Sequence, residues 1–287
     1  MNTNIHKNKI PRHTIIQQVQ NALDEDIGHG DITAALINAD KTATAQLIVR
    51  ESALLCGMDW FEQAFLLLDK STYFNWQQTD GETLVANQLV CEITGKAAAM
   101  LTAERTALNF LQTLSATATI TAHYAGYLSD SNIRLLDTRK TLPGLRSAQK
   151  YAVTCGGGYN HRHGLFDGVL IKENHIMAAG GIKQAIQQAK KITTHGLKIE
   201  IEVETLDEVQ QALDAQADIL LLDNMPLSML QQAVEINRNR ATHTALLEVS
   251  GNINEQKLTQ LNNIGIDFVS VGGLTKDVKA IDFSLRF

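Results

Sequence analysis

Residues 199–215, IEIEVETLDEVQQALDA, hold a strand pattern followed directly by a helix pattern. The first part alternates branched apolar residues with glutamates, which is typical of a strand whose two faces have different surroundings. The second part spaces its apolar residues as an α-helix does. A strand that leads straight into a helix predicts one βα unit of a parallel sheet.

The same order recurs along the chain after Ser129. Short apolar runs alternate with helical patterns, and this alternation predicts an α/β barrel. The expected strands are 133–136, 168–171, 199–203, 219–222, 246–249 and 268–271, and the expected helices are 181–193, 206–215, 227–237 and 255–264.

The region before Ser129 has a different, α+β pattern. Helices are expected at 12–27, 58–69 and 98–118, and strands at 43–50, 73–76 and 89–93. Arg105 borders the expected apolar stripe of the third helix, so its side chain either reaches water or contacts a partner; that stripe consists of Leu101, Leu108, Leu111 and Leu114. We therefore expect an N-terminal domain at 1–115 and a barrel domain at 116–275, with residues 276–287 as a candidate to return to the first.

Composition excludes several classes of protein. The chain has 287 residues, a net charge of −6 and 44% hydrophobic residues, which suits a globular protein with a full core and argues against a general nucleic-acid binder. The polar amino terminus lacks a signal-peptide core, and no apolar run reaches membrane-spanning length, so a cytoplasmic protein is expected. The three cysteines have no C-x-x-C spacing and predict neither a disulfide framework nor a zinc site.

Positive charge is concentrated in residues 133–172, against the negative charge of the whole chain. Only Asp137 and Asp167 oppose seven cations there, and Pro-Gly and Gly-Gly-Gly breaks argue against a simple solvated helix face. The segment therefore predicts a site for an anion, within which His161 and His163 flank Arg162. The cations are Arg134, Arg139, Lys140, Arg146, Lys150, Arg162 and Lys172; Arg146 and Lys150, on a helix after Pro143, are expected to be surface or dimer charges.

Polar residues follow five of the expected barrel strands, where barrel enzymes place their sites. The glutamates of 199–204 should face inward, because the helices pack outside, and buried carboxylates need cations or a metal. Glu202 and Asp223 would suit Mg²⁺ shared with substrate phosphates, although a network of structural Glu–Lys pairs is the alternative. The small turns 250–252 and 271–273 can present backbone N–H groups to a phosphate.

Several long motifs resemble those of the quinolinate phosphoribosyltransferase (nicotinate-nucleotide pyrophosphorylase, carboxylating) family. They are ERTALNFLQTLSATAT, TRKTLPGLR, NHRHGLFDGVLIKENH, IEVE, LLDNM, SGN and SVGGLTK, and they run through nearly the whole chain. The resemblance implies an N-terminal open-faced α/β sandwich and a C-terminal incomplete, TIM-like α/β barrel. It also implies a homodimer in which each barrel mouth is covered by the partner's N-terminal domain; whether dimers pair further stays open.

The resemblance further implies a pentosyltransferase of de novo NAD biosynthesis. Its reaction joins quinolinate to 5-phosphoribosyl 1-pyrophosphate and yields nicotinate mononucleotide, pyrophosphate and CO₂. Lys140, Lys172, Glu202 and Asp223 would be catalytic, and the two carboxylates would hold Mg²⁺ or ribose hydroxyls. The implied substrate contacts are Arg139, His161, Arg162, Lys172 and the partner's Arg105 for quinolinate, Lys140 close to both substrates, and Ser250, Gly251, Asn252, Val271, Gly272 and Gly273 for the 5-phosphate. Thr138 is a further substrate contact, not assigned to either substrate.

Other functions are compatible with the same fold. A paralogous group associated with molybdenum transport shares it, although the full set of basic residues favours quinolinate. A lysine aldolase would use Lys140 or Lys172 as a Schiff-base amine, and a non-catalytic phosphate-binding barrel is a third reading. No nucleic-acid or membrane partner is expected. His29 is interpreted as a turn residue and Cys155 as a buried filler, without an assigned role.

Overall fold

The computed structural model describes residues 10–193 and 196–287, so most of the polar amino-terminal stretch lies outside the described residues. These residues form two compact units. The first contains the chain up to His123 together with Thr141–Gly157 and Gly273–Phe287, and the second contains Tyr124–Lys140 and Gly158–Gly272. The segment Thr141–Gly157 thus packs with the first unit, whereas the sequence pattern grouped it with the barrel.

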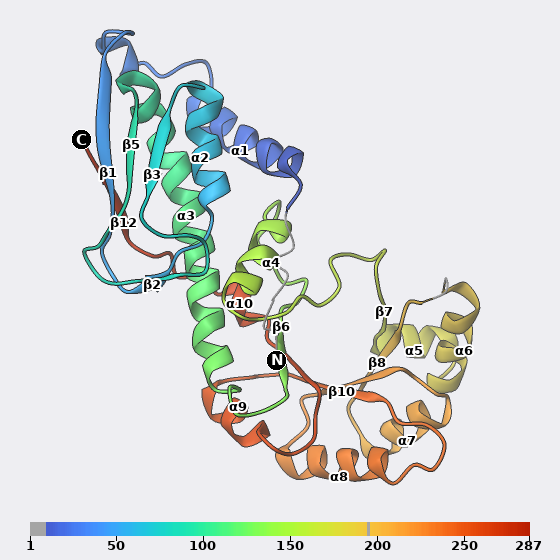
Figure 1. Ribbon diagram of the computed structural model, residues 1–287. Helices are drawn as coiled ribbons and strands as arrows, with labels where there is room; N and C mark the ends of the chain where they lie inside the picture. Colours follow the sequence, from blue (N-terminus) through green and yellow to red (C-terminus); the bar gives the residue numbers. More distant parts are fainter. Residues whose placement is uncertain (1–9, 194–195) are drawn as a thin grey trace. The chain divides into compact units, whose positions relative to one another are not determined.

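The first unit is built on a four-stranded antiparallel sheet in the order β12-β1-β5-β3. Along β1, alternate residues such as Ala45 and Leu47 are buried while Thr44 and Gln46 are exposed, so one face of the sheet is open. Helices α1, α2 and α3 cover the other face (Figure 1). The strands are β1 (Thr42–Val49), β3 (Tyr73–Trp76), β5 (Leu89–Lys96) and β12 (Phe283–Arg286), with a separate pair β2 (Ala53–Leu54) and β4 (Thr83–Leu84).

The helices of this unit bury one face each. Helix α1 (Arg12–Ile27) buries Ile15, Val19 and Leu23 and ends at Gly28, whose φ of 54° suits glycine. Helices α2 (Met58–Leu68) and α3 (Ala97–Gly126) pack beside it. Leu101, expected in the buried stripe of α3, is instead 42% exposed, because it lies one turn from the exposed Arg105 on the same face.

Two later segments complete the first unit. They supply the helices α4 (Arg146–Cys155) and α10 (Gly273–Lys276), and β12, which pairs with β1. The expectation that Lys150 is a surface charge is wrong: its exposed fraction is 0%, because α4 is buried over most of its surface. Arg146 is half-buried, and Cys155 is buried as expected.

The second unit is a six-stranded, wholly parallel sheet in the order β6-β11-β10-β9-β8-β7. Strands β6 and β7 form its two edges and are not paired with each other among the described residues, so the barrel is incomplete. The predicted α/β fold is thereby confirmed. The strands are β6 (Arg134–Leu136), β7 (Val169–Ile171), β8 (Ile199–Val203), β9 (Ile219–Asp223), β10 (Leu246–Ser250) and β11 (Phe268–Ser270).

Helices follow the strands and lie on the outside of the sheet (Figure 1). They are α5 (Glu173–Ala179), α6 (Ile182–Ile192), α7 (Leu206–Asp214), α8 (Leu227–Arg238) and α9 (Glu255–Leu261). Their packing explains β8, where Ile199, Ile201 and Val203 are buried on the helix side and the glutamates face inward, as predicted. None of the helices in the described part of the chain is long and apolar enough to cross a membrane.

Candidate active site

The carboxyl ends of β7, β8 and β9 bring a lysine and two acidic residues together. Lys172, directly after β7, forms an ion pair with Glu202 of β8, whose nearest oxygen lies 2.7 Å from the ammonium nitrogen. Asp223 ends the next strand and accepts hydrogen bonds from the Ser250 hydroxyl and, at 2.6 Å, from the Asn224 amide. The neighbouring side chains therefore fix the orientation of the Asp223 carboxylate.

A third carboxylate joins these two. The oxygens of Glu202, Glu204 and Asp223 all lie within 4.8 Å of one another. Loss of hydration raises the pKa of Glu204, and the negative charge of Asp223 adds to the shift. Such a set of hard oxygen donors with mutual repulsion fits a divalent cation such as Mg²⁺. The sequence pointed to Glu202 and Asp223; Glu204, although it follows the same alternation, was not named.

Basic residues lie at the end of β6, beside the turn that follows β11. The Lys140 backbone N–H donates to the Thr138 hydroxyl over 3.0 Å, which shapes the segment after β6. Gly272 sits against it: a Cβ atom there would lie 3.0 Å from Cδ of Lys140 and 3.6 Å from the Thr138 hydroxyl. The predicted glycine turn thus lies directly beside Thr138 and Lys140.

The turns after β9 and β10 approach each other very closely. Asn224, Gly251 and Asn252 all have positive φ angles, and the Asn224 N–H donates to the Ser250 carbonyl over 3.2 Å. A Cβ atom on Gly251 would lie 2.8 Å from the backbone nitrogen of Asn224, so only glycine fits. These left-handed turns expose backbone groups at the carboxyl ends of the strands, as a phosphate site requires.

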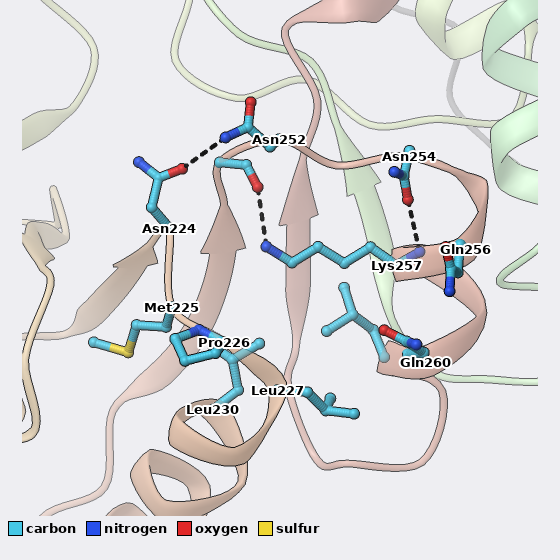
Figure 2. A pocket seen from close by; sticks show the side chains of 12 residues that line it. Asn224, Met225, Pro226, Leu227, Leu230, Asn252, Asn254, Gln256, Lys257 and Gln260 are labelled. Carbon is cyan, nitrogen blue, oxygen red and sulfur yellow. Dashed lines mark hydrogen bonds between the residues drawn. The ribbon is translucent and has the colours of Figure 1, made fainter.

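Lys257 supports this turn and was not predicted. From α9 it extends along a cavity of about 570 Å³ and donates from Nζ to the Gly251 carbonyl over 3.0 Å (Figure 2). Burial lowers the pKa of Lys257, and the charge of Asp223 opposes that shift. No local motif marks this lysine, because the contact depends on how α9 folds back onto the turn before it.

The loop from Asn160 to Gly168 carries the predicted His161 and Arg162. The fully buried Asp137 accepts from the His161 N–H at 2.9 Å and from the Asn160 amide at 2.6 Å, which anchors the start of the loop. The Arg162 guanidinium donates to the Gly168 carbonyl over 3.3 Å. Burial lowers the pKa of Arg162, and the charge of Arg139 lowers it further.

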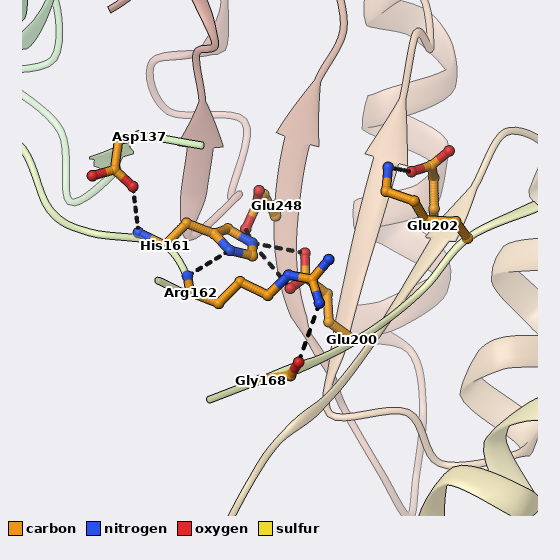
Figure 3. Close-up of polar contacts among 8 residues, drawn as sticks. Asp137, His161, Arg162, Gly168, Glu200, Glu202 and Glu248 are labelled. Atoms are coloured by element: carbon orange, nitrogen blue, oxygen red, sulfur yellow. Dashed lines mark hydrogen bonds and ion pairs between the residues drawn. The ribbon is translucent and has the colours of Figure 1, made fainter. Parts of the chain in front are cut away.

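The His161 imidazole faces two glutamates of the sheet. Its Nε2 atom lies 3.1 Å from Glu200 and 3.6 Å from Glu248, and its Nδ1 atom accepts the Arg162 N–H (Figure 3). Glu200 faces inward as the sequence indicated, but its partner Glu248 lies within what reads as an apolar run. A contact between side chains of two different strands cannot be read from the periodicity of either segment, so the sequence did not predict this cluster.

Most of the predicted site residues lie in the second unit. His161 and Arg162, however, line a cavity with residues that begin strands, such as Ile219 of β9, and that cavity does not include Lys172, Glu202 or Asp223. Two predicted residues belong to the first unit: Arg105, exposed on α3, and Gly273, which begins α10. The roles assigned to all of these residues stay predictions. The residues in the second unit are Thr138, Arg139, Lys140, His161, Arg162, Lys172, Glu202, Asp223, Ser250, Gly251, Asn252, Val271 and Gly272.

Comparison with known proteins agrees with this arrangement. Residues 117–286 match the family model for the quinolinate phosphoribosyl transferase C-terminal domain, and residues 31–115 match that for the N-terminal domain. A probable nicotinate-nucleotide pyrophosphorylase (carboxylating) of Bacillus subtilis is 38% identical over 91% of this chain and 89% of its own. The nicotinate-nucleotide pyrophosphorylase (carboxylating) of Mycobacterium leprae is 36% identical over 93% and 95%.

Solved structures give the same result for the three-dimensional fold. The nicotinate-nucleotide pyrophosphorylase of Francisella tularensis has a TM-score of 0.90 and 46% identity, covering 97% of this chain and 98% of that one. NadC of Streptococcus pyogenes has a TM-score of 0.92 and 38% identity, covering 98% of each chain. With both domains matched and relatives aligned over nearly their full length, the chain belongs to the quinolinate phosphoribosyltransferase family.

Proposed function

We propose that this chain transfers the phosphoribosyl group of 5-phosphoribosyl 1-pyrophosphate to quinolinate with loss of CO₂, giving nicotinate mononucleotide and pyrophosphate. This is the reaction of a carboxylating nicotinate-nucleotide diphosphorylase, EC 2.4.2.19. The observation that carries the proposal is the meeting of Lys172, Glu202 and Asp223 at adjacent strand ends of the incomplete barrel. A dianionic pyridine and a polyphosphate require both cations and a metal-binding carboxylate cluster in one pocket.

Quinolinate binding is assigned to the basic side of this site. Arg139 and Arg162 would face the two carboxylates of the pyridine, with Thr138 and Lys172 beside them. Desolvation already lowers the pKa of Arg162, so a dicarboxylate that pairs with this guanidinium would relieve an unfavourable burial. Lys172 would exchange its contact with Glu202 for one with the substrate, because both contacts use the same half-exposed ammonium.

The acidic side would receive Mg²⁺ and the pyrophosphate. Glu202 and Asp223, with Glu204 at the rim, supply oxygen ligands whose mutual repulsion a divalent cation would offset. When bound, the ion would neutralise charge on the departing pyrophosphate. Lys140 would lie between the two substrates, and the turns at Gly251 and Gly272 would offer backbone N–H groups to the 5-phosphate.

We also propose the homodimer that the family resemblance implies, in which Arg105 serves the partner's pocket. One face of α3 is exposed in the isolated chain, and it carries Leu101, Arg105 and Asn109 at successive turns. An apolar side chain beside an arginine on one exposed stripe is typical of a protein interface. We propose that this stripe faces the second copy.

The direct test is product formation by the purified chain. Incubation with quinolinate, 5-phosphoribosyl 1-pyrophosphate and Mg²⁺ should release equal amounts of CO₂ and nicotinate mononucleotide, measured as trapped ¹⁴CO₂ and by chromatography. Glu202→Ala should lose at least about a hundredfold in kcat/KM because the carboxylate acts in the site itself. The exposed Glu235→Ala of α8 is the matched control and should match the parent chain. Absence of product from the parent chain would refute the proposal.

A further inference from the structure

A buried cluster inside the second unit consists of His161, Glu200 and Glu248. The two glutamates come from β8 and β10, which flank β9, and only 5% and 2% of their surface is exposed. Their oxygens and a ring nitrogen of His161 lie within 4.8 Å of one another. The neighbouring inward side chains on β9, Ile219 and Leu221, are apolar, so no charge from that strand compensates the pair.

The hydrogen bonds of His161 determine where its proton resides. Nδ1 accepts the backbone N–H of Arg162 at 2.7 Å, and a ring nitrogen that accepts a hydrogen bond carries no proton. The proton must therefore be on Nε2, which points at Glu200 over 3.1 Å. In the opposite tautomer, the N–H group at Nδ1 would point at the backbone N–H of Arg162, and neither donor would have an acceptor in this contact. Both ring nitrogens are thus already engaged inside the protein.

The Nε2–H group of His161 faces both carboxyl groups. Glu248 also has a hydrogen bond with the Ser270 side chain, and the charge of Arg162 acts on Glu200. Burial raises the pKa of Glu248 to about 7, the charge of Glu200 adds to the shift, and His161 and Ser270 oppose it. Two buried carboxylates this close do not both ionise readily, which fits the raised pKa of Glu248, and Glu200 is the carboxyl group nearest to Nε2 of His161. The basic residues that line the adjoining cavity are Arg134, Arg162 and Lys198.

On the basis of the proposed function, we infer that Glu200 and Glu248 are positioning residues that hold His161 as its Nε2–H tautomer, so that Nδ1 fixes the backbone of Arg162, which binds quinolinate in that proposal. The connection is one of adjacent hydrogen bonds: Glu200 to Nε2, then Nδ1 to the Arg162 N–H, with the Arg162 guanidinium held against the Gly168 carbonyl.

Substitutions of Glu200 separate positioning from simple electrostatics. Removing a negative charge near an anion site should, by charge alone, tighten quinolinate binding, so both Glu200→Leu and Glu200→Gln would lower its KM. Positioning predicts the opposite for Glu200→Leu, which removes the acceptor: about a tenfold rise in the quinolinate KM with the phosphoribosyl pyrophosphate KM unchanged. Glu200→Gln keeps a carbonyl acceptor and should stay within about threefold of the parent chain. A lowered KM in both variants, or equal changes in both KM values, would overturn the inference.

The pH dependence tests the second glutamate. Above pH 7 the ionised Glu248 would place an additional negative charge near the anion site, so the quinolinate KM of the parent chain should rise between pH 6.5 and 8.5. Glu248→Gln resembles the protonated form and should flatten that rise, with a smaller effect at pH 6.5 than Glu200→Leu has. Glu235→Gln, which changes an exposed carboxylate, should retain the slope of the parent chain. An unchanged slope in Glu248→Gln would contradict the assignment.

A measurement on the unmodified chain covers the case in which the variants fail to fold or the proposed reaction is not observed. In ¹⁵N NMR of the substrate-free protein, the His161 signals, identified by their loss in His161→Gln, should show a protonated Nε2 and an unprotonated Nδ1 at pH 7. This result supports the positioning cluster even without turnover, so the two proposals fail independently. A protonated Nδ1 would refute the cluster.

Discussion

Glu200 and Glu202 share one face of β8, yet their surroundings differ at the scale of a single residue. Glu200 lies deep in the sheet beside His161, whereas Glu202 lies at the strand end and binds Lys172. Strand alternation predicted that both point inward, because it depends only on residues two apart. It could not predict Glu248, because lateral pairing between distant strands is set by tertiary register. The alternation is a property of β8 alone, whereas Glu248 comes from another strand.

Lys257 is the residue we expect to hold the turn at Gly251, the proposed phosphate site, in place. Lys257→Met keeps the length of the side chain but removes the hydrogen bond to the Gly251 carbonyl. Losing a charged hydrogen bond costs about 1.5 kcal/mol or more, which corresponds to roughly a tenfold rise in the phosphoribosyl pyrophosphate KM. Steady-state kinetics should show that rise with the quinolinate KM within about twofold. The exposed Lys183→Met on α6 controls for the lost charge, and equal effects in both variants would contradict a specific role.

At the scale of elements, helix positions were easier to predict than helix surroundings. The pattern predicted α6, α7 and α8 to within two residues at either end, because their apolar periodicity is local. It gave no sign of α5, whose seven residues follow Lys172 directly, and it placed Lys150 of α4 on the surface. Burial on nearly all sides of a helix depends on the elements packed around it, which a sequence window does not contain.

Asp80 joins two helices of the first unit. Its Oδ1 accepts the N–H groups of Gly57 and Met58 at the start of α2, and its Oδ2 accepts the Tyr151 hydroxyl of α4 at 2.9 Å. Asp80→Ala removes the carboxylate that accepts the N–H groups at the start of α2 and the Tyr151 hydroxyl, so the free energy of unfolding should fall by about 2 kcal/mol or more. Urea unfolding followed by circular dichroism measures this, and the exposed Asp59→Ala of α2 should change it by much less. Similar losses in both variants would argue against the cap.

At the scale of the whole molecule, the chain passes from one unit to the other more than once. Residues 141–157 and 273–287 belong to the first unit, although the segments that precede them in the chain, 124–140 and 158–272, belong to the second. The local patterns identified a barrel and an α+β region, and the tail was expected as a candidate to return to the latter, where β12 pairs with β1. The interleaved segment 141–157 could not be assigned from pattern, because a helix carries no sign of which core it will cover.

A homodimer with shared sites makes a quantitative prediction for mixed subunits. Arg105→Ala and Lys172→Ala should each be nearly inactive alone. If Arg105 serves the partner's site, every mixed dimer contains one intact site, so random exchange of equal amounts should restore about a quarter of the parent activity. Exchange is verified by native mass spectrometry of differently tagged chains. With exchange confirmed, an inactive mixture would show that Arg105 does not act in the partner's site.

The pairing of β12 with β1 also bears on when the first unit can finish folding during synthesis. The Asp282 N–H bonds to Glu51 across 231 residues of chain, and β12 follows every strand of the second unit in sequence. While the ribosome makes those strands, β1 is an uncovered sheet edge, and an uncovered edge can pair with another nascent chain. Slow translation of the strands of the second unit would lengthen the time for which β1 is uncovered. The speed of synthesis should therefore affect the aggregation of this protein more than the stability of the finished fold affects it.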